Sequence, residues 1–98
     1  MKRKTIVEKI IEFVKDEHYE EYYVGITANP EKRLESEHKV DMNKDHRDSY
    51  IFKKAKSAKS ARKAECQLLE KGFKGGSGGG KKNAKYVYAY RITSTTSQ

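Results

Sequence analysis

The chain has 98 residues and a net charge of +8 at pH 7, with 37% charged and 35% hydrophobic residues. This length suits one domain with a small core, in which seven Tyr and three Phe must take a large part. No apolar run reaches the roughly 18 residues of a transmembrane helix, and no apolar segment of a signal peptide follows the basic start. A single cysteine excludes an internal disulfide, so we expect a cytoplasmic protein that does not act at a membrane.

The positive charge is concentrated in the C-terminal half. Residues 1–49 contain 10 Lys/Arg and 12 Asp/Glu, whereas residues 50–98 contain 12 Lys/Arg and 2 Asp/Glu. Such an imbalance favours a polyanionic partner, DNA or RNA, although a solvated lysine-rich surface would have the same composition. The residues that we expect to follow a nucleic-acid backbone are Lys53, Lys54, Lys56, Lys59, Arg62, Lys63, Lys81 and Lys82.

The N-terminal half predicts a helix, a strand and a second helix. Residues 5–17 repeat apolar side chains at helical spacing, and Thr5 and Glu8 have the spacing of a capping box. Residues 22–27 are aromatic or β-branched in the manner of a strand. Asn29-Pro30 then predicts a helix start, with the helix ending near residue 38 and a polar loop over residues 39–48.

The C-terminal half predicts a strand over residues 49–54, a helix from Ala61 to Lys71 capped by Ser60 and ended by Gly72, and a closing strand over residues 86–92. The closing strand is expected at an edge of the sheet or against a helix. A Gly- and Lys-rich connection, residues 75–83, precedes it.

Helical spacing places Glu65 within the apolar stripe of the predicted third helix, rather than on its wet face. A carboxylate in this place lies near the end of a core face, is paired, or serves a cleft. The neighbouring Cys66 is interpreted as a buried small residue rather than a nucleophile.

Two familiar kinds of site are excluded. Residues 75–81 fit the spacing of a phosphate-binding P-loop, but Lys82 stands where Ser or Thr is needed and a helix precedes the segment. The three histidines match no zinc-binding spacing, and no set of thiol ligands accompanies them.

Residues 23–38, Tyr-Val-Gly-Ile-Thr-Ala-Asn-Pro-Glu-Lys-Arg-Leu-Glu-Ser-Glu-His, resemble the second half of the GIY-YIG nuclease signature. In that family a strand ending in Tyr-Ile-Gly leads into a helix that carries an Arg and often a His. Tyr23-Val24-Gly25 resembles the Tyr-Ile-Gly element, Arg33 the helix Arg, and His38 the His. Farther along, residues 61–65 resemble the helix whose Glu binds the metal, so the resemblance covers about residues 22–71.

The resemblance implies an α/β (α+β) fold in which about three helices flank a three-stranded mixed or antiparallel sheet. The whole chain, residues 1–98, would then form one such domain, with residues 22–71 as its motif-bearing core. The family's first element, Gly-Ile-Tyr, is not found, because the predicted N-terminal helix occupies the region where its strand would lie. Tyr19 and Tyr22 are the candidates to supply the missing hydroxyl.

The resemblance also implies a set of catalytic roles. Tyr23, with Tyr19 or Tyr22, would transfer a proton, and the planar guanidinium of Arg33 would bind phosphate oxygens. Glu65 would hold one Mg²⁺ or Mn²⁺ together with water and substrate. His38 would transfer a second proton or position the phosphate. We therefore expect Tyr23, Arg33 and Glu65 around one cleft.

These observations support a metal-dependent endonuclease that acts on nucleic acid. The alternative is a protein of the same fold that has lost catalysis and binds nucleic acid, a nucleotide or a protein partner, for example a phage or mobile-element inhibitor of a host system. A basic protein bound to ribosomal RNA is a third hypothesis, which accounts for the charge but not for Glu65.

Overall fold

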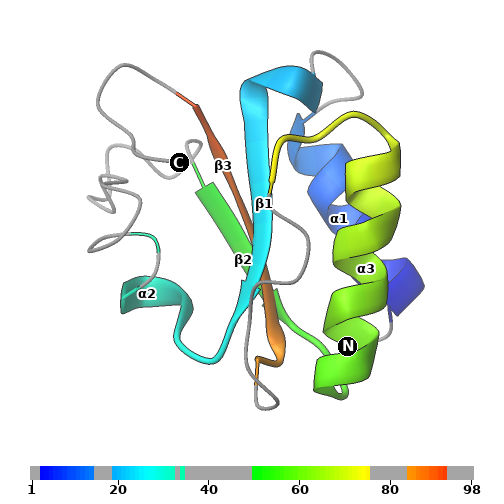
Figure 1. Ribbon diagram of the computed structural model, residues 1–98, viewed down its shortest axis with the longest axis vertical. Coiled ribbons are helices and arrows are strands. Elements are labelled where there is room, and N and C mark those ends of the chain that lie inside the picture. Colours follow the sequence, from blue (N-terminus) through cyan, green and yellow to red (C-terminus); the bar gives the residue numbers. More distant parts are fainter. Residues whose placement is uncertain (1–2, 15–18, 33, 35–49, 76–83, 93–98) are drawn as a thin grey trace.

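The computed structural model describes residues 3–14, 19–32, 34, 50–75 and 84–92 (Figure 1). The elements follow the order α1 (Arg3–Val14), η1 (Tyr19–Glu21), β1 (Tyr22–Thr27), α2 (Pro30–Lys32), β2 (Tyr50–Lys54), α3 (Ala58–Glu70) and β3 (Tyr86–Arg91). The expected α+β fold is confirmed. Within the described residues, no helix is long and apolar enough to cross a membrane.

The three strands form one antiparallel sheet with the order β1-β3-β2. Strand β3, the last in sequence, therefore lies in the centre and pairs with both of the others. Of the two placements expected for it, the edge of the sheet is wrong, and packing against a helix is confirmed. On one side Tyr90 pairs with Tyr23 and Tyr88 pairs with Gly25. On the other side Tyr90 pairs with Tyr50, and Tyr88 pairs with Phe52.

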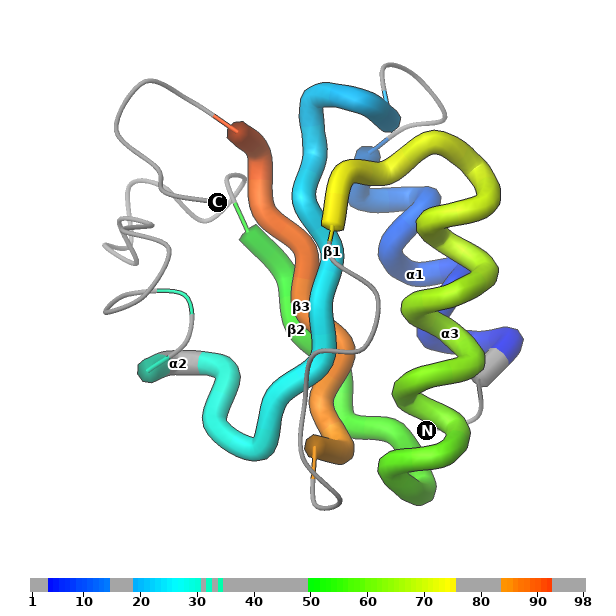
Figure 2. Tube along the Cα trace, viewed as in Figure 1, coloured from blue at the N-terminus to red at the C-terminus, as the bar shows by residue number. Residues whose placement is uncertain are grey.

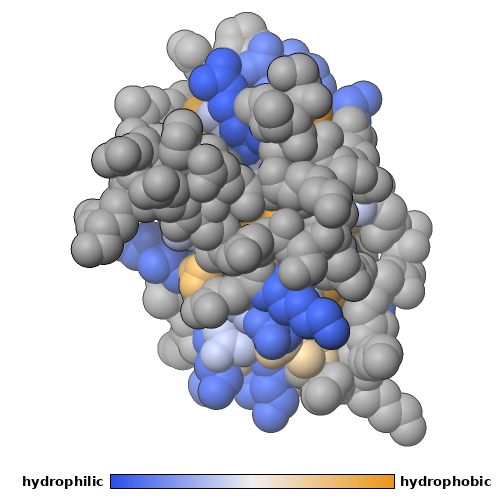
Figure 3. All heavy atoms as spheres, turned by 90° about the vertical axis from the view of Figure 1, so that its left-hand side faces the viewer, coloured by the Kyte–Doolittle hydropathy of each residue, from blue (hydrophilic) through white to orange (hydrophobic). Residues whose placement is uncertain are grey.

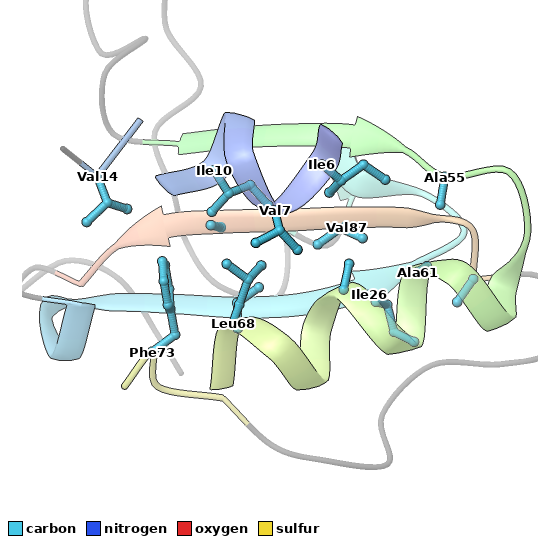
Figure 4. Close-up of a cluster of buried hydrophobic side chains, with 14 residues drawn as sticks. Ile6, Val7, Ile10, Val14, Ile26, Ala55, Ala61, Leu68, Phe73 and Val87 are labelled. Atoms are coloured by element: carbon cyan, nitrogen blue, oxygen red, sulfur yellow. The ribbon is translucent and has the colours of Figure 1, made fainter. Parts of the chain in front are cut away.

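One face of the sheet, here called the helix-covered face, packs against α1 and α3, while α2 lies on the other side (Figure 1). In Figure 4, Ile6 and Ile10 of α1 and Leu68 of α3 lie over Val87 of β3. These four side chains are fully buried. Each such burial stabilises the fold by about 1.5–3 kcal/mol, so this cluster is the main core.

The opposite face, here called the tyrosine face, carries a second and smaller core. Because side chains alternate along a strand, Tyr23 of β1 and Tyr88 and Tyr90 of β3 share this face, where they pack with Leu34. The rings of Tyr23 and Tyr90 are stacked with centroids 5.3 Å apart. Tyr88 and Tyr90 are buried, and the described residues visible on this side show only small hydrophobic areas (Figure 3).

The second helix begins as predicted. Asn29 caps α2, because its side-chain Oδ1 accepts a hydrogen bond of 3.2 Å from the backbone N–H of Lys32. Of the predicted continuation of this helix to residue 38, the structure describes residue 34 alone. The predicted loop over residues 39–48 lies outside the described residues. The same holds for residues 76–83 of the Gly- and Lys-rich connection.

The start of the third helix is corrected by the structure. Ser57, not Ser60, is the N-cap, because its hydroxyl accepts a hydrogen bond of 3.2 Å from the backbone N–H of Ser60. The helix therefore begins at Ala58, one turn earlier than predicted. Thr5 likewise lies inside α1, which includes Arg3, and so does not cap it.

The predicted end of the third helix at Gly72 is confirmed. Gly72 has φ = 116°, a conformation that L side chains rarely adopt. Its N–H donates to the carbonyl of Leu69 (3.1 Å), and the N–H of Phe73 donates to that of Leu68 (3.4 Å). These two bonds form the Schellman motif, which turns the chain back toward β1.

Gly25 is required for the contact between β1 and β3. A Cβ atom at Gly25 would overlap the hydroxyl of Tyr88 and would lie 2.6 Å from its Cζ and 2.9 Å from its Cε1. No φ in the left-handed range is involved, so space alone excludes a larger residue here.

We predict that Gly25→Ala lowers the free energy of unfolding by about 2 kcal/mol or more, because it overfills this contact. In a Tyr88→Leu background the same substitution should cost less than about 1 kcal/mol, since the three atoms nearest to the added methyl group are gone. Urea unfolding of the four proteins measures both effects. Equal costs in the two backgrounds would show that Tyr88 does not set the requirement for glycine.

Candidate active site

Glu65 is the buried polar side chain of α3. It shares the inward stripe of the helix with Ala61, Ala64 and Leu68, as the sequence predicts, and its exposed fraction is 1%. Its Oε1 atom is buried and has no hydrogen-bond partner among the residues that the structure describes. Burial raises the pKa of the Glu65 carboxyl, and the positive charge of Arg62 opposes this rise with a smaller effect. A buried carboxylate oxygen without a partner is costly unless a proton or a cation compensates it.

Helix geometry places Glu65 beside the outer edge of β1. Leu69 lies one turn farther along the same side of α3. Its side chain lies close to β1, because a Cβ atom at Gly75 would approach both Leu69 Cδ2 (2.9 Å) and the carbonyl oxygen of Val24 (2.6 Å). Because α3 runs antiparallel to β1 (Figure 1), one turn back along the helix leads toward the C-terminal half of the strand. Glu65 therefore lies level with the part of β1 that follows Val24.

The N-terminal half of that outer edge is covered by the segment that follows α3 (Figure 2). The backbone N–H of Lys74 donates to the carbonyl of Tyr22 (2.8 Å), and its carbonyl accepts from the N–H of Val24 (2.9 Å). Among the described residues, the pairing of this segment with β1 ends at Val24. The described pairing thus stops short of the part of the strand that is level with Glu65.

Tyr23 and Glu65 approach β1 from opposite faces of the sheet. The ring of Tyr23 belongs to the tyrosine face, whereas α3 packs on the helix-covered face. Tyr23 and Glu65 therefore do not face each other across one cleft as expected, and Arg33, the third expected member, lies outside the described residues. Because β1 is an edge strand of the three, the two side chains could meet only around its outer edge, beyond the part beside Tyr23 where Lys74 pairs with the strand.

Tyr19 and Tyr22 do not share the face of Tyr23. The ring of Tyr19 stacks on Phe73 with centroids 5.1 Å apart, and that of Tyr22 meets Phe13 edge-on at 5.7 Å. Both rings pack against the main core under α1 and α3. Neither ring belongs to the cluster that contains Tyr23. Tyr22 points away from it because consecutive strand residues point to opposite faces, and Tyr19 lies in η1, before the strand begins.

The tyrosines that accompany Tyr23 are instead Tyr88 and Tyr90 of β3, which the sequence interpretation missed. Burial, together with the nearby hydroxyls of Tyr23 and Tyr88, raises the pKa of Tyr90 well above its usual value. The sequence signal for this cluster is the alternation of tyrosine at residues 86, 88 and 90, which places all three on one face.

The basic residues of the β2–α3 corner are accessible. Lys54, Lys56, Lys59 and Lys63 are exposed, and Lys53 and Arg62 are half-buried. The Nζ of Lys54 lies 6.0 Å from the ring centroid of Tyr86. The remaining predicted site residues, Arg33, His38, Lys81 and Lys82, lie outside the described residues.

The donor set fits a single hard cation. In the part of the chain that the structure describes, no group of three or more His, Cys, Asp and Glu side chains is placed to hold a metal. Mg²⁺ is commonly held by one or two carboxylates, with water and substrate phosphates as its other ligands. The orphaned oxygen of Glu65 meets that requirement.

Cys66 is exposed, not buried as expected, because it lies just outside the inward stripe of α3.

Among known protein families, the family model described as the GIY-YIG catalytic domain matches residues 10–84 of the chain. The matched segment includes Tyr23, Arg33, His38 and Glu65 but ends before β3. No curated protein and no solved structure matches the chain.

The buried carboxyl predicts how stability depends on pH. Because the pKa of Glu65 is raised in the folded state, its contribution to stability is greatest below the unfolded value of about 4.3 and is lost as pH rises through the folded value. With EDTA present, wild type should therefore lose stability relative to Glu65→Gln as the pH is raised from about 4. Urea unfolding at a series of pH values measures the difference. The control is Glu70→Gln, an exposed change on the same helix that leaves Glu65 in place, so this variant should keep the dependence on pH of the wild type.

Proposed function

This chain belongs to the GIY-YIG family, a nuclease-type family, and we propose that it is an endonuclease that hydrolyses phosphodiester bonds of nucleic acid with one divalent cation, Mg²⁺ or Mn²⁺. The observation that carries the proposal is the buried Oε1 of Glu65, for which the described part of the chain offers no hydrogen-bond partner. A stable fold gains nothing from such an atom, whereas a cation-binding site requires it.

Glu65 would hold the cation at the outer edge of β1, with water and substrate oxygens as the other ligands. When bound, the cation supplies a positive charge that stabilises the negative charge developing on the phosphate and the leaving oxygen. The hydrophobic neighbours of Glu65 on α3 keep the carboxylate dry, which strengthens its attraction for a cation.

The other roles belong to side chains around the same edge. Tyr23 would act from the tyrosine face as the group that accepts or relays a proton from the attacking water. Arg33, which follows α2, would bind phosphate oxygens with its planar guanidinium. His38 would assist as a second proton-transfer group or as a phosphate ligand.

The basic corner between β2 and α3 would bind the nucleic acid on either side of the cleaved bond. Lys54, Lys56, Lys59 and Lys63 are exposed there, and Arg62 lies about one helical turn before Glu65 on α3. Such contacts go to the backbone, so they provide affinity rather than sequence specificity.

A second function is favoured by one observation. Tyr23 and Glu65 approach β1 from opposite faces of the sheet, which suits a protein that has kept the fold and lost turnover. Such a protein would bind nucleic acid, a nucleotide or a protein partner, in the way that a phage or mobile-element inhibitor acts on a host system. Its Glu65 would then be compensated by the charge of Arg62 rather than by a metal ion.

Metal binding separates the two functions. Saturating Mg²⁺ or Mn²⁺ should raise the Tm of the wild type by about 5 °C or more, because the cation binds only the folded state. Glu65→Gln keeps the shape and removes the charge, so it should abolish both this shift and cleavage of DNA or RNA. Glu70→Gln, an exposed change on the same helix, should retain both. Thermal melts and gel-based cleavage assays measure these effects.

The opposite result would favour the binding protein. In that case neither cation changes the Tm, no DNA or RNA is cleaved, and Glu65→Gln leaves ligand binding partly intact.

The basic corner predicts a salt-dependent interaction. Lys54→Glu with Lys59→Glu should weaken binding of a DNA or RNA oligonucleotide and reduce the slope of log K against log salt by about one for each phosphate that is no longer neutralised. The matched control is Lys4→Glu with Lys9→Glu, which makes the same change in charge at exposed positions of α1. Fluorescence anisotropy at several salt concentrations measures both. Equally weakened binding in the two double variants would mean that net charge alone attracts the nucleic acid.

A further inference from the structure

The sheet places a second tyrosine beside Tyr23 from an unexpected part of the chain. The two tyrosines that precede Tyr23 in sequence, Tyr19 and Tyr22, point their rings into the core under α1 and α3. Strand β3 instead runs antiparallel along the inner edge of β1, and it brings Tyr88 opposite Gly25. This strand lies beyond residues 10–84, the segment that matches the family model.

The contact between Tyr88 and Gly25 fixes the hydroxyl of Tyr88 on the tyrosine face. All three atoms nearest to a Cβ at Gly25 belong to Tyr88, and its hydroxyl is the closest of them. The ring therefore lies flat across the glycine, and Tyr88 is only 1% exposed. The glycine of the Tyr23-Val24-Gly25 element thus has a definite role, which is to leave room for this ring.

Tyr23 and Tyr88 are diagonal neighbours on the same face. Tyr23 pairs with Tyr90 and Gly25 pairs with Tyr88, so the two side chains are separated by one diagonal step between adjacent strands, a distance that aromatic side chains span. Tyr90 packs against both, and its ring stacks on that of Tyr23. The hydroxyls of Tyr23 and Tyr88 both act on the ionisation of Tyr90.

We propose that β3 completes the active site from the C-terminal end of the sequence, with Tyr88 as a positioning residue that orients the hydroxyl of Tyr23 and stabilises it during proton transfer. This proposal rests on the proposed function. Relative to the family signature, the strand order along the chain is permuted, because the strand that pairs with Tyr23-Val24-Gly25 follows that element instead of preceding it. Tyr88 takes the place of the tyrosine of the Gly-Ile-Tyr element that is not found before Tyr23.

The test removes one hydroxyl and keeps the ring. In the full chain with Mg²⁺, Tyr88→Phe should lower kcat about tenfold or more and leave KM within about twofold of wild type, because Tyr88 acts on the chemical step and not on binding. The pH profile of kcat should also move to higher pH, since a neighbouring hydroxyl favours the ionised form of a group that gives up its proton. A purely structural role would lower the Tm without moving this profile.

The matched control is Tyr86→Phe, the same change two residues away on the same strand and the same face. We expect it to retain the wild-type kcat and pH profile. If Tyr88→Phe behaves like Tyr86→Phe in both respects while Glu65→Gln is inactive, the role of Tyr88 is overturned and the proposed endonuclease stands.

A second measurement decides the role of Tyr88 without relying on activity. The side-chain ¹³C resonances of Tyr23 should shift in Tyr88→Phe at neutral pH and stay in place in Tyr86→Phe. Unchanged Tyr23 resonances in both variants would contradict the proposal. If wild type cleaves no nucleic acid, the proposed function fails, and this spectrum still shows whether Tyr88 acts on Tyr23.

Discussion

The fold depends on the insertion of β3 between β1 and β2. In the sheet of the described residues, β1 and β2 do not pair with each other, so the last strand in sequence joins the other two. The close fit of Tyr88 against Gly25 fixes the register of this insertion on one side. Because a slip by one residue would turn every side chain to the opposite face, the same contact separates the apolar side chains of the helix-covered face from the tyrosines.

The separation of the two faces gives them different tasks. The helix-covered face buries aliphatic side chains under α1 and α3, and this burial provides most of the stability of a small chain with few apolar residues. The tyrosine face holds hydroxyl-bearing rings, whose polar ends are able to transfer protons. Glu65 departs from this division, since it is a carboxylate within the apolar layer. Violations of this kind are expected at functional sites, where a cost in stability is retained for chemistry.

The local elements followed from the sequence, because their determinants are local. Residues 22–27 form the predicted strand, Asn29 caps α2, Gly72 ends α3 and Glu65 is buried. The burial of Glu65 was predicted from its position within the helical stripe of apolar residues that includes Ala61 and Leu68. The predicted start of α3 is wrong because Ser57 and Ser60 are both able to cap a helix, and spacing alone does not choose between them.

The arrangement of the strands could not be predicted in the same way, since alternation along residues 86–92 indicates a strand with two faces but not which strands lie beside it. Closeness in sequence therefore favours Tyr19 and Tyr22 as neighbours of Tyr23, whereas the sheet supplies Tyr88. Similarly, no pattern in the sequence indicates that Tyr23 and Glu65 approach β1 from opposite sides, because this depends on which face α3 covers.

The central claim is that one cation bound by Glu65 lies at the outer edge of β1, within reach of the tyrosine face. Paramagnetic broadening of the backbone amide signals by Mn²⁺ measures this position directly, because the effect falls steeply with distance from the ion. The account predicts the strongest broadening around Glu65 and along the C-terminal half of β1, weaker broadening at Tyr23 and Tyr88, and none of it in Glu65→Gln. Broadening centred on the acidic side chains of α1, or an unchanged pattern in Glu65→Gln, would contradict it.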